Sequence, residues 1–270
     1  MDIGSLFWIF LILISFQPLI RQKLIETARF NLIARIEKKR KSRVILIVHR
    51  QETMSFMGFP IMRFLNMDDS EEVLRALHMT DSKTPVDIVL HTPGGLVLAA
   101  VQIARAIQMR KAPVRVIVPH MAMSGGTLIA LAADEIIMSP HAVLGPVDPQ
   151  LGQLPAASIL KAVQTKKPAD IDDTTLIQAD MAKKAIQQLE TFVHELLKEK
   201  MPAKQAQKTA KLLTQGTWTH DYGITSEEAK KFGLPVNTEI PNEFLELMSL
   251  YPQPMKKMPT VEYLPNQKST

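Results

Sequence analysis

Two short glycine-rich loops carry the residues best suited to chemistry. The first reads Thr92-Pro93-Gly94-Gly95, and the second reads Ala122-Met123-Ser124-Gly125-Gly126-Thr127. Paired glycines let the backbone turn sharply, and their N–H groups can converge on one point, as an oxyanion requires. Ser124 begins a predicted helix, whose dipole favours developing negative charge. The pattern indicates acyl transfer with Ser124 as the nucleophile, although a plain helix N-cap role for this serine stays open.

Other site chemistries find less support. The loops match neither GxxxxGK[ST] nor GxGxxG, so nucleotide binding is not supported. Ala122 stands where a GxSxG elbow has its first glycine. The chain has no cysteine, which excludes thiolate nucleophiles and thiolate metal ligands. No His, Asp or Glu cluster has the spacing of metal ligands, so we expect no metal and no cofactor.

The elements that must position these loops alternate between strands and helices. Apolar, β-branched runs predict strands at 43–48, 86–91, 114–118 and 135–138. Helices are expected after each glycine loop and at 68–77, 172–200 and 203–213. Asp69 or Ser70 is expected to cap the helix at 68–77. This alternation predicts an α/β domain with a parallel sheet, in which ligands bind at the carboxyl ends of the strands, where both glycine loops lie.

An uncharged apolar segment, residues 3–20, begins the chain. It is long enough to span a bilayer if Arg21 and Lys23 reach the headgroups, and no small-residue cleavage site follows it. The basic run at 35–43 lies on its C-terminal side. The positive-inside rule therefore predicts a single-pass anchor in the cell membrane with a cytoplasmic catalytic domain.

The N-terminal charge and the C-terminal composition suggest further divisions of the chain. We expect a transmembrane anchor at residues 1–21 and a basic juxtamembrane helix at 22–42 that faces anionic membrane lipid. A proline-rich tail at 251–270 is expected to be disordered. Nucleic acid is not expected as a partner, because the preceding apolar segment favours lipid for the basic run.

Four longer motifs carry a family resemblance: HTPGGLVLAAVQIARA (91–106), VPHMAMSGGTLIALAADEI (118–136), LGPVDPQLG (144–152) and TWTHDYGITSEEAKKFGL (217–234). In this order they resemble the Clp-protease/crotonase superfamily. Within it, the chain resembles the serine dehydrogenase proteinase family and is similar to the signal peptide peptidase A-type Ser–Lys peptidases. The resemblance covers about residues 43–250 and implies a Clp/crotonase-like spiral of parallel β-strands and helices.

The resemblance implies a serine endopeptidase that hydrolyses a protein or peptide substrate as a homo-oligomer. Ser124 matches the nucleophile, and Gly94 and Gly95 match the oxyanion-hole glycines. The N–H of Gly125 would be a second oxyanion donor.

The general base is less directly indicated. Typical Clp peptidases use a histidine in the region that here reads GPVDPQ, where Asp148 is present without a histidine. The related Ser–Lys enzymes imply Lys184, which follows Asp180 by four residues, with Lys183 as the alternative and Asp148 as a further candidate. A lysine base must be partly buried so that its pKa falls.

Histidines remain alternatives for the base. His91 and His120 end strands beside the glycine loops, and either could accept a proton or simply orient a loop. His220, in the sequence WTHDYG, is expected to belong with Trp218 and Asp221 to a structural or pocket-wall motif.

Two other functions stay open. One is a non-catalytic membrane scaffold that keeps the fold without turnover. The other is a crotonase-like enzyme acting on an acyl thioester, in which the glycines hold an enolate and Ser124 is incidental.

Overall fold

The central feature is a five-stranded parallel sheet. The computed structural model describes residues 3–49, 55–56, 59–60 and 63–251, with side chains at 17, 19–49 and 63–251. The strand order is β1-β4-β5-β7-β12, and every neighbouring pair is parallel. The strands are β1 (Arg43–Val48), β4 (Val86–His91), β5 (Val114–Val118), β7 (Glu135–Met138) and β12 (Val236–Asn237). The α/β class and the first four strands are as predicted, whereas β12 was not predicted.

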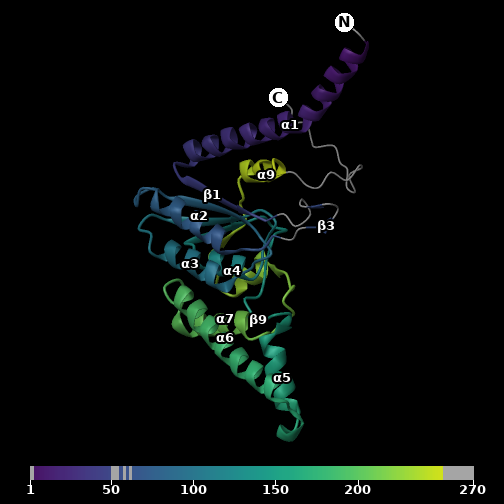
Figure 1. Ribbon diagram of the computed structural model, residues 1–270. Helices are drawn as coiled ribbons and strands as arrows, with labels where there is room; N and C mark the ends of the chain where they lie inside the picture. Colours follow the sequence, from purple (N-terminus) through teal and green to yellow (C-terminus); the bar gives the residue numbers. More distant parts are fainter. Residues whose placement is uncertain (1–2, 50–54, 57–58, 61–62, 252–270) are drawn as a thin grey trace.

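Helices cover both faces of this sheet (Figure 1). They are α1 (Ile3–Arg40), α2 (Met67–His78), α3 (Val97–Gln108), α4 (Gly125–Ala132), α5 (Ala156–Thr165), α6 (Asp173–Leu197), α7 (Ala203–Thr214), α8 (Ser226–Lys231) and α9 (Asn242–Ser249). The helices predicted at 68–77, 172–200 and 203–213 are confirmed as α2, α6 and α7. The expected cap of α2 is wrong: Asn66 is the N-cap, and it forms a capping box with Asp69.

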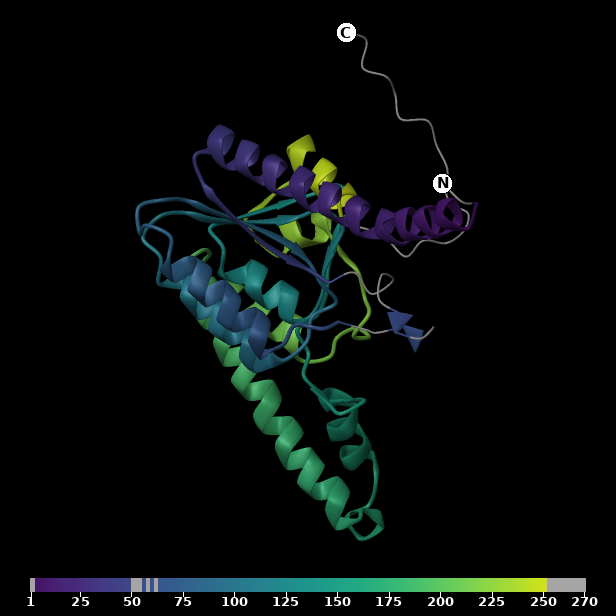
Figure 2. The same cartoon turned by 45° about the horizontal axis from the view of Figure 1, so that its top comes forward.

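The sheet separates two apolar cores, because side chains alternate between its faces. On one face, Val44, Val89 and Ile117 pack with Leu32 of α1 and Phe244 of α9. The opposite face packs against α2, α3, α4, α6 and α7, and it carries Ile45, Ile88, Val116 and Ile136. Figure 2 shows α1 and α9 together on one side of the sheet.

Smaller strands connect the sheet to the C-terminal half. A three-stranded sheet has the order β11-β8-β6. Its strands are β6 (Met121–Ala122), β8 (Val143–Leu144) and β11 (Ile224–Thr225). Two antiparallel pairs are formed by β2 (Ser55–Phe56) with β3 (Phe59–Pro60) and by β9 (Gln150–Leu151) with β10 (Leu154–Pro155). Beyond β10, α5 and the N-terminal part of α6 form an arm that projects from the body (Figures 1 and 2).

The basic helix predicted at 22–42 is the C-terminal part of α1, and it packs on the sheet. Leu32 and Ile36 are only 1% exposed. The anchor predicted at residues 1–21 falls largely on residues whose side chains are not described, and no helix within the described residues is long and apolar enough to cross a membrane. The tail predicted at 251–270 lies outside the described residues except for Tyr251.

A buried carboxylate joins α1 to the sheet. Asp87 of β4 is fully buried and accepts hydrogen bonds from Arg40 Nε and Arg115 Nε, each at 2.6 Å. Ser42 Oγ also donates to it at 2.5 Å. These three donors satisfy a charge that would otherwise be costly to bury.

Asp87→Asn should lower the free energy of unfolding by about 3–5 kcal/mol, because it leaves two arginines without their shared partner. Urea unfolding of the full chain in detergent, followed by tryptophan fluorescence, would measure this loss. Glu71→Gln is the matched control, since Glu71 is exposed on α2 and its change should stay within about 0.5 kcal/mol. Equal urea midpoints for the two variants would contradict the assignment.

Candidate active site

Ser124 lies in a strained turn between β6 and α4. Its backbone has φ +49° and ψ −114°, in the positive-φ region that residues other than glycine seldom adopt. The Ser124 side chain makes no N-cap hydrogen bond, so the plain capping role is not observed. Such strain costs on the order of 1–3 kcal/mol and commonly marks active sites. Although Ala122 replaces the first glycine of GxSxG, the turn still leads from a strand into a helix.

The two glycine loops approach each other backbone to backbone. Gly94 has φ +100°, and a Cβ atom there would lie 2.7 Å from Ser124 Cβ and 3.0 Å from Gly125 N. A parallel bridge between Thr92 and Ala122 joins the loops, with Met123 N–H donating to Thr92 O at 2.9 Å. Glycine at position 94 therefore allows an approach that a side chain would prevent.

Gly95 and Gly125 present two neighbouring N–H groups. Leu65 N–H donates to Gly94 O at 2.7 Å, and Leu96 N–H donates to Leu65 O at 2.8 Å. In a parallel bridge of this kind, the N–H of the intervening Gly95 faces away from Leu65. Gly125 is the first residue of α4, so its N–H has no partner within the helix. Gly95 N lies 3.6 Å from the position that a Cβ of Gly125 would occupy.

Gly94 contributes space rather than a donor. Its N–H donates to Thr92 Oγ1 at 3.1 Å, so it is already engaged. Of the two glycines predicted for the oxyanion hole in the first loop, Gly95 is the one whose geometry fits a donor.

Ser124 lines a cavity of about 520 Å³. This volume is typical of small-ligand and substrate sites. Apolar side chains form much of its wall, among them Val97, Met123, Leu128, Val147 and Leu189. Gly95 and Gly125 also line it, which places both N–H donors beside the serine.

A histidine–carboxylate pair lines the same cavity. His220 Nδ1 lies 2.8 Å from Asp148 Oδ1, and Gln150 Nε2 donates to Asp148 Oδ2 at 2.7 Å. The Asp148 side chain is 3% exposed, whereas that of His220 is 34% exposed. Asp148, a predicted site candidate, therefore lies in the cavity, but its partner is a histidine that the sequence predicted as part of a structural or pocket-wall motif. The motif LGPVDPQ supplies Asp148 and the motif WTHDYG supplies His220, so the pair would have been found by considering the two motifs together.

Aromatic packing holds the turn that carries His220. The rings of Trp218 and Tyr222 stack with centroids 5.0 Å apart and an interplanar angle of 2°. Tyr222 Oη donates to Glu228 Oε1 at 2.6 Å, and this hydrogen bond raises the pKa of Tyr222. The two rings flank His220 in the chain and tie its turn to α8.

The predicted lysines lie elsewhere. Lys184 Nζ donates to Asp180 Oδ2 at 2.5 Å on the surface of α6, as the four-residue spacing predicted. Both side chains of this pair are largely exposed, at 66% and 60%, and Lys183 is exposed as well. Neither lysine lines the Ser124 cavity. Their surroundings lack the burial expected of a lysine base.

A different lysine has a lowered pKa. Burial lowers the pKa of Lys200 to about 8. Its Nζ donates to Leu131 O at 2.6 Å and to Ala133 O, at the C-terminal end of α4. Ser124 is at the opposite end of this helix, roughly 12 Å away along its axis. Lys200 therefore caps the helix and is not placed to act on the serine.

The other histidines near the glycine loops are not in the cavity. His49 is buried, with Nδ1 2.9 Å from Thr92 Oγ1 and Nε2 3.3 Å from Asp69 Oδ2. His91 and His120 pack ring edge to ring face, with centroids 5.6 Å apart. Within the described residues, no group of three or more His, Asp or Glu side chains could hold a metal ion.

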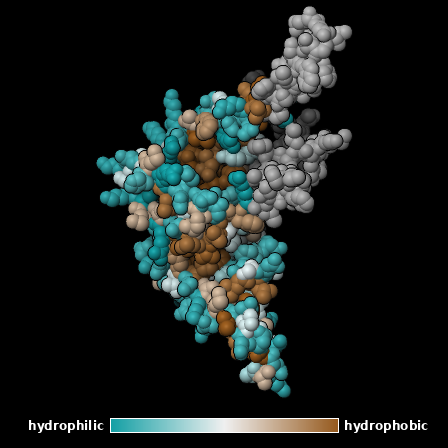
Figure 3. Space-filling model, in the orientation of Figure 1, coloured by the Kyte–Doolittle hydropathy of each residue, from teal (hydrophilic) through white to brown (hydrophobic). Residues whose placement is uncertain are grey.

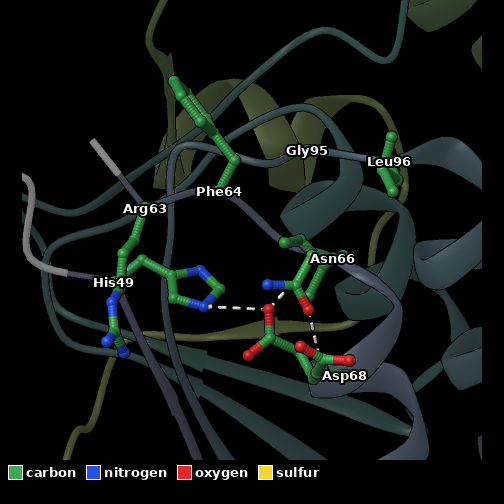
Figure 4. Close-up of a pocket in the computed structure, with 9 residues that line it drawn as sticks. His49, Arg63, Phe64, Asn66, Asp68, Gly95 and Leu96 are labelled. Carbon is green, nitrogen blue, oxygen red and sulfur yellow. Dashed lines mark hydrogen bonds and ion pairs between the residues drawn. The ribbon is translucent and has the colours of Figure 1, made fainter. Parts of the chain in front are cut away.

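A second cavity of about 700 Å³ adjoins the first and shares Phe64 and Gly95 with it. Figure 4 shows His49 and Asp68 in this second cavity, with Phe64 and Gly95 near its edge. The two cavities are therefore neighbours, with Phe64 and Gly95 in the wall of both.

The chain is similar to several known proteins. Two uncharacterized proteins of Methanocaldococcus jannaschii are similar over nearly the whole chain. One is 52% identical over 96% of this chain and 91% of its own length, and the other is 51% identical over 98% and 90%. Among solved structures, the membrane-bound stomatin-specific protease 1510-N superposes with a TM-score of 0.49 at 23% identity, covering 76% of this chain and 82% of that one.

The family assignment rests on the complete sequence. Residues 1–270 match the family model described as ClpP-like SDH-type serine proteinase. The chain therefore belongs to the ClpP-like SDH-type serine proteinase family.

Proposed function

We propose that this protein is a serine endopeptidase in which Ser124 attacks the carbonyl carbon of a peptide bond. The observation that supports the proposal is that Ser124 lines one cavity with Gly95 and Gly125, whose N–H groups are not used in the Leu65 bridge or within α4. As the tetrahedral intermediate forms, its oxygen becomes negative, and these donors stabilise the charge together with the N-terminus of α4.

The base in this mechanism was predicted to be Lys184, or Lys183 in its place. That assignment stays a prediction. Because neither lysine lines the Ser124 cavity of its own chain, this role would require α6 to bring a lysine to the serine in another way, for example to the serine of a neighbouring copy in an oligomer.

The two alternative functions differ from the proposal in the role that they give to Ser124. A membrane scaffold needs no reactive serine, and a crotonase-like acyl-thioester enzyme would use the glycine loops with Ser124 incidental. The strained φ of Ser124 favours the peptidase, because strain at one residue is retained where that residue has a specific task.

Ser124→Ala should abolish covalent labelling by a fluorophosphonate probe and lower hydrolysis of unfolded casein by at least about 10³-fold, because the nucleophile is lost. Gly95→Ala keeps the N–H but places a Cβ 2.2 Å from Leu65 O, so the loop must shift the donor and the rate should fall by about 10²–10³-fold while Ser124 remains present. Ser158→Ala, an exposed serine of α5, is the control and should behave as the wild type. Full activity in Ser124→Ala would point to a different function.

We also propose that the chain is anchored in the cell membrane by residues 1–21, with the catalytic domain in the cytoplasm. The uncharged apolar run and the basic residues that follow it support this. Exposed apolar side chains continue along α1 beyond the run, at Leu24 and Phe30, which are 66% and 67% exposed. Such side chains suit a helix that lies at a lipid surface after leaving the bilayer.

Leu11→Arg should shift the full chain from the carbonate-resistant membrane fraction to the soluble fraction, since a central charge costs about 2.5–3.5 kcal/mol on insertion. Leu19→Arg, near the predicted end of the span, should remain in the membrane because its side chain can reach the headgroups. Protease added to sealed vesicles should digest the domain only from the cytoplasmic side. Digestion only from the opposite side would reverse the proposed orientation.

Self-association is the third part of the proposal. The arm exposes Leu176, Ile177 and Met181, and the adjoining β10 exposes Leu154, each between 44% and 61% exposed. Ile177 and Met181 are four residues apart and therefore share one face of α6. Figure 3 shows apolar side chains on the arm and on the body beside it. A second copy of the chain would cover this apolar face.

The double variant Ile177→Asp, Met181→Asp should reduce the mass of the detergent-solubilised full chain, measured by light scattering, from that of an oligomer toward that of a monomer. Charges on the covered face would oppose burial. Met79→Asp changes a methionine that is 79% exposed on the body and should leave the mass unchanged. A wild-type protein that is monomeric at micromolar concentration would disprove self-association.

A further inference from the structure

We propose that His220, oriented by Asp148, is the general base for Ser124. This inference rests on the proposed function, since it names the group that accepts the serine proton. All three residues line one cavity, although they come from three separate parts of the chain. Ser124 precedes α4, Asp148 lies between β8 and β9, and His220 lies in the turn between α7 and β11.

The contact between the two side chains determines which imidazole nitrogen is free. An ionised carboxylate can only accept hydrogen bonds, so His220 Nδ1 must carry a proton and donate it to Asp148 Oδ1 at 2.8 Å. In the neutral ring, Nε2 then holds the lone pair. Within the described residues, no hydrogen bond engages this nitrogen. The ring therefore has one nitrogen fixed and the other available as a proton acceptor.

The surroundings of Asp148 keep its carboxylate in a fixed position beside the His220 ring. Asp148 is 4% exposed, and its second oxygen accepts a hydrogen bond from Gln150 Nε2 at 2.7 Å. Gln150 Nε2 also lies 3.2 Å from His220 Nδ1, but a protonated Nδ1 cannot accept from it, so the amide donates to Asp148. The backbone of this segment is held by α7, since Val147 N–H donates to Leu213 O at 2.8 Å. A buried carboxylate that accepts two hydrogen bonds holds an imidazole in a fixed orientation and stabilises the imidazolium when it forms.

The other candidate bases have hydrogen-bond or ion-pair partners elsewhere. Both nitrogens of His49 contact neighbours, and the Lys184 ammonium pairs with Asp180 at the surface. Lys200 serves the far end of α4. His220 is the histidine that combines a place in the Ser124 cavity with a carboxylate partner.

The reaction balances with these groups alone and water. As Ser124 Oγ bonds to the carbonyl carbon, its proton moves to His220 Nε2. The imidazolium then gives this proton to the departing amine nitrogen as the C–N bond breaks, which leaves an acyl-enzyme. Water attacks the ester carbon and passes a proton to Nε2, and that proton returns to Ser124 Oγ as the acid is released.

The test compares variants of the full chain in detergent, with casein hydrolysis and fluorophosphonate labelling as readouts. His220→Ala should lower kcat by about 10²–10⁴-fold, and added imidazole should restore part of the loss. His220→Gln keeps a side chain that can bond Asp148 but cannot act as a base, so it should be equally impaired. Asp148→Asn tests the positioning role and should lower kcat with little change in KM.

A control and a test of the rival base give each outcome a meaning. His141→Ala removes an exposed histidine outside the cavity and should leave the rates unchanged. Lys184→Ala tests the lysine that the sequence predicted as the base. Near wild-type activity in His220→Gln, or a large loss in Lys184→Ala with none in His220→Ala, would overturn the inference in favour of another base. If the wild type itself neither labels nor hydrolyses casein, the proposed function fails, and this inference fails with it.

Discussion

Main-chain contact between the two glycine loops is the constraint on which the site depends. A Cβ atom at Gly95 would lie 2.2 Å from Leu65 O, and one at Gly94 would lie 2.7 Å from Ser124 Cβ. No side chain separates the loops, so the donors are placed by backbone bonds that continue from β4 and β6. Main-chain positions vary less than side-chain rotamers. Backbone N–H groups are therefore suited to stabilising an oxyanion, because the donors must be in place before the negative charge develops.

The strain at Ser124 is held from both ends of α4. Beside the serine, Thr127 Oγ1 donates to Ala122 O at 2.7 Å and accepts from Gly145 N–H at 2.9 Å. This hydroxyl joins the turn to the segment that leads to Asp148. At the other end, Lys200 binds the last carbonyl groups of the helix. These contacts hold α4 on both sides, next to the turn in which Ser124 has a φ of +49°.

Strands, helices and the position of Ser124 at the start of a helix could be predicted from the sequence because each depends on local pattern. Apolar runs defined β1, β4, β5 and β7, and the glycine loops marked Ser124. The pairing of Asp148 with His220 could not be predicted, because the two residues are far apart in the sequence. The packing of α7 and the stacking of Trp218 on Tyr222 bring His220 close to Asp148. The cap of α2 was misassigned for a similar reason: Asn66 follows an irregular segment whose course the pattern does not determine.

The separation of the cavity walls along the chain has a consequence for biosynthesis. Ser124 leaves the ribosome well before the turn around His220, and at about 5–20 residues per second the delay is on the order of 5–20 s. During that interval α4 and both glycine loops can form, but the wall that includes His220 and Asp221 does not yet exist. A nascent or prematurely terminated chain therefore lacks part of this cavity wall until the turn around His220 has been synthesised.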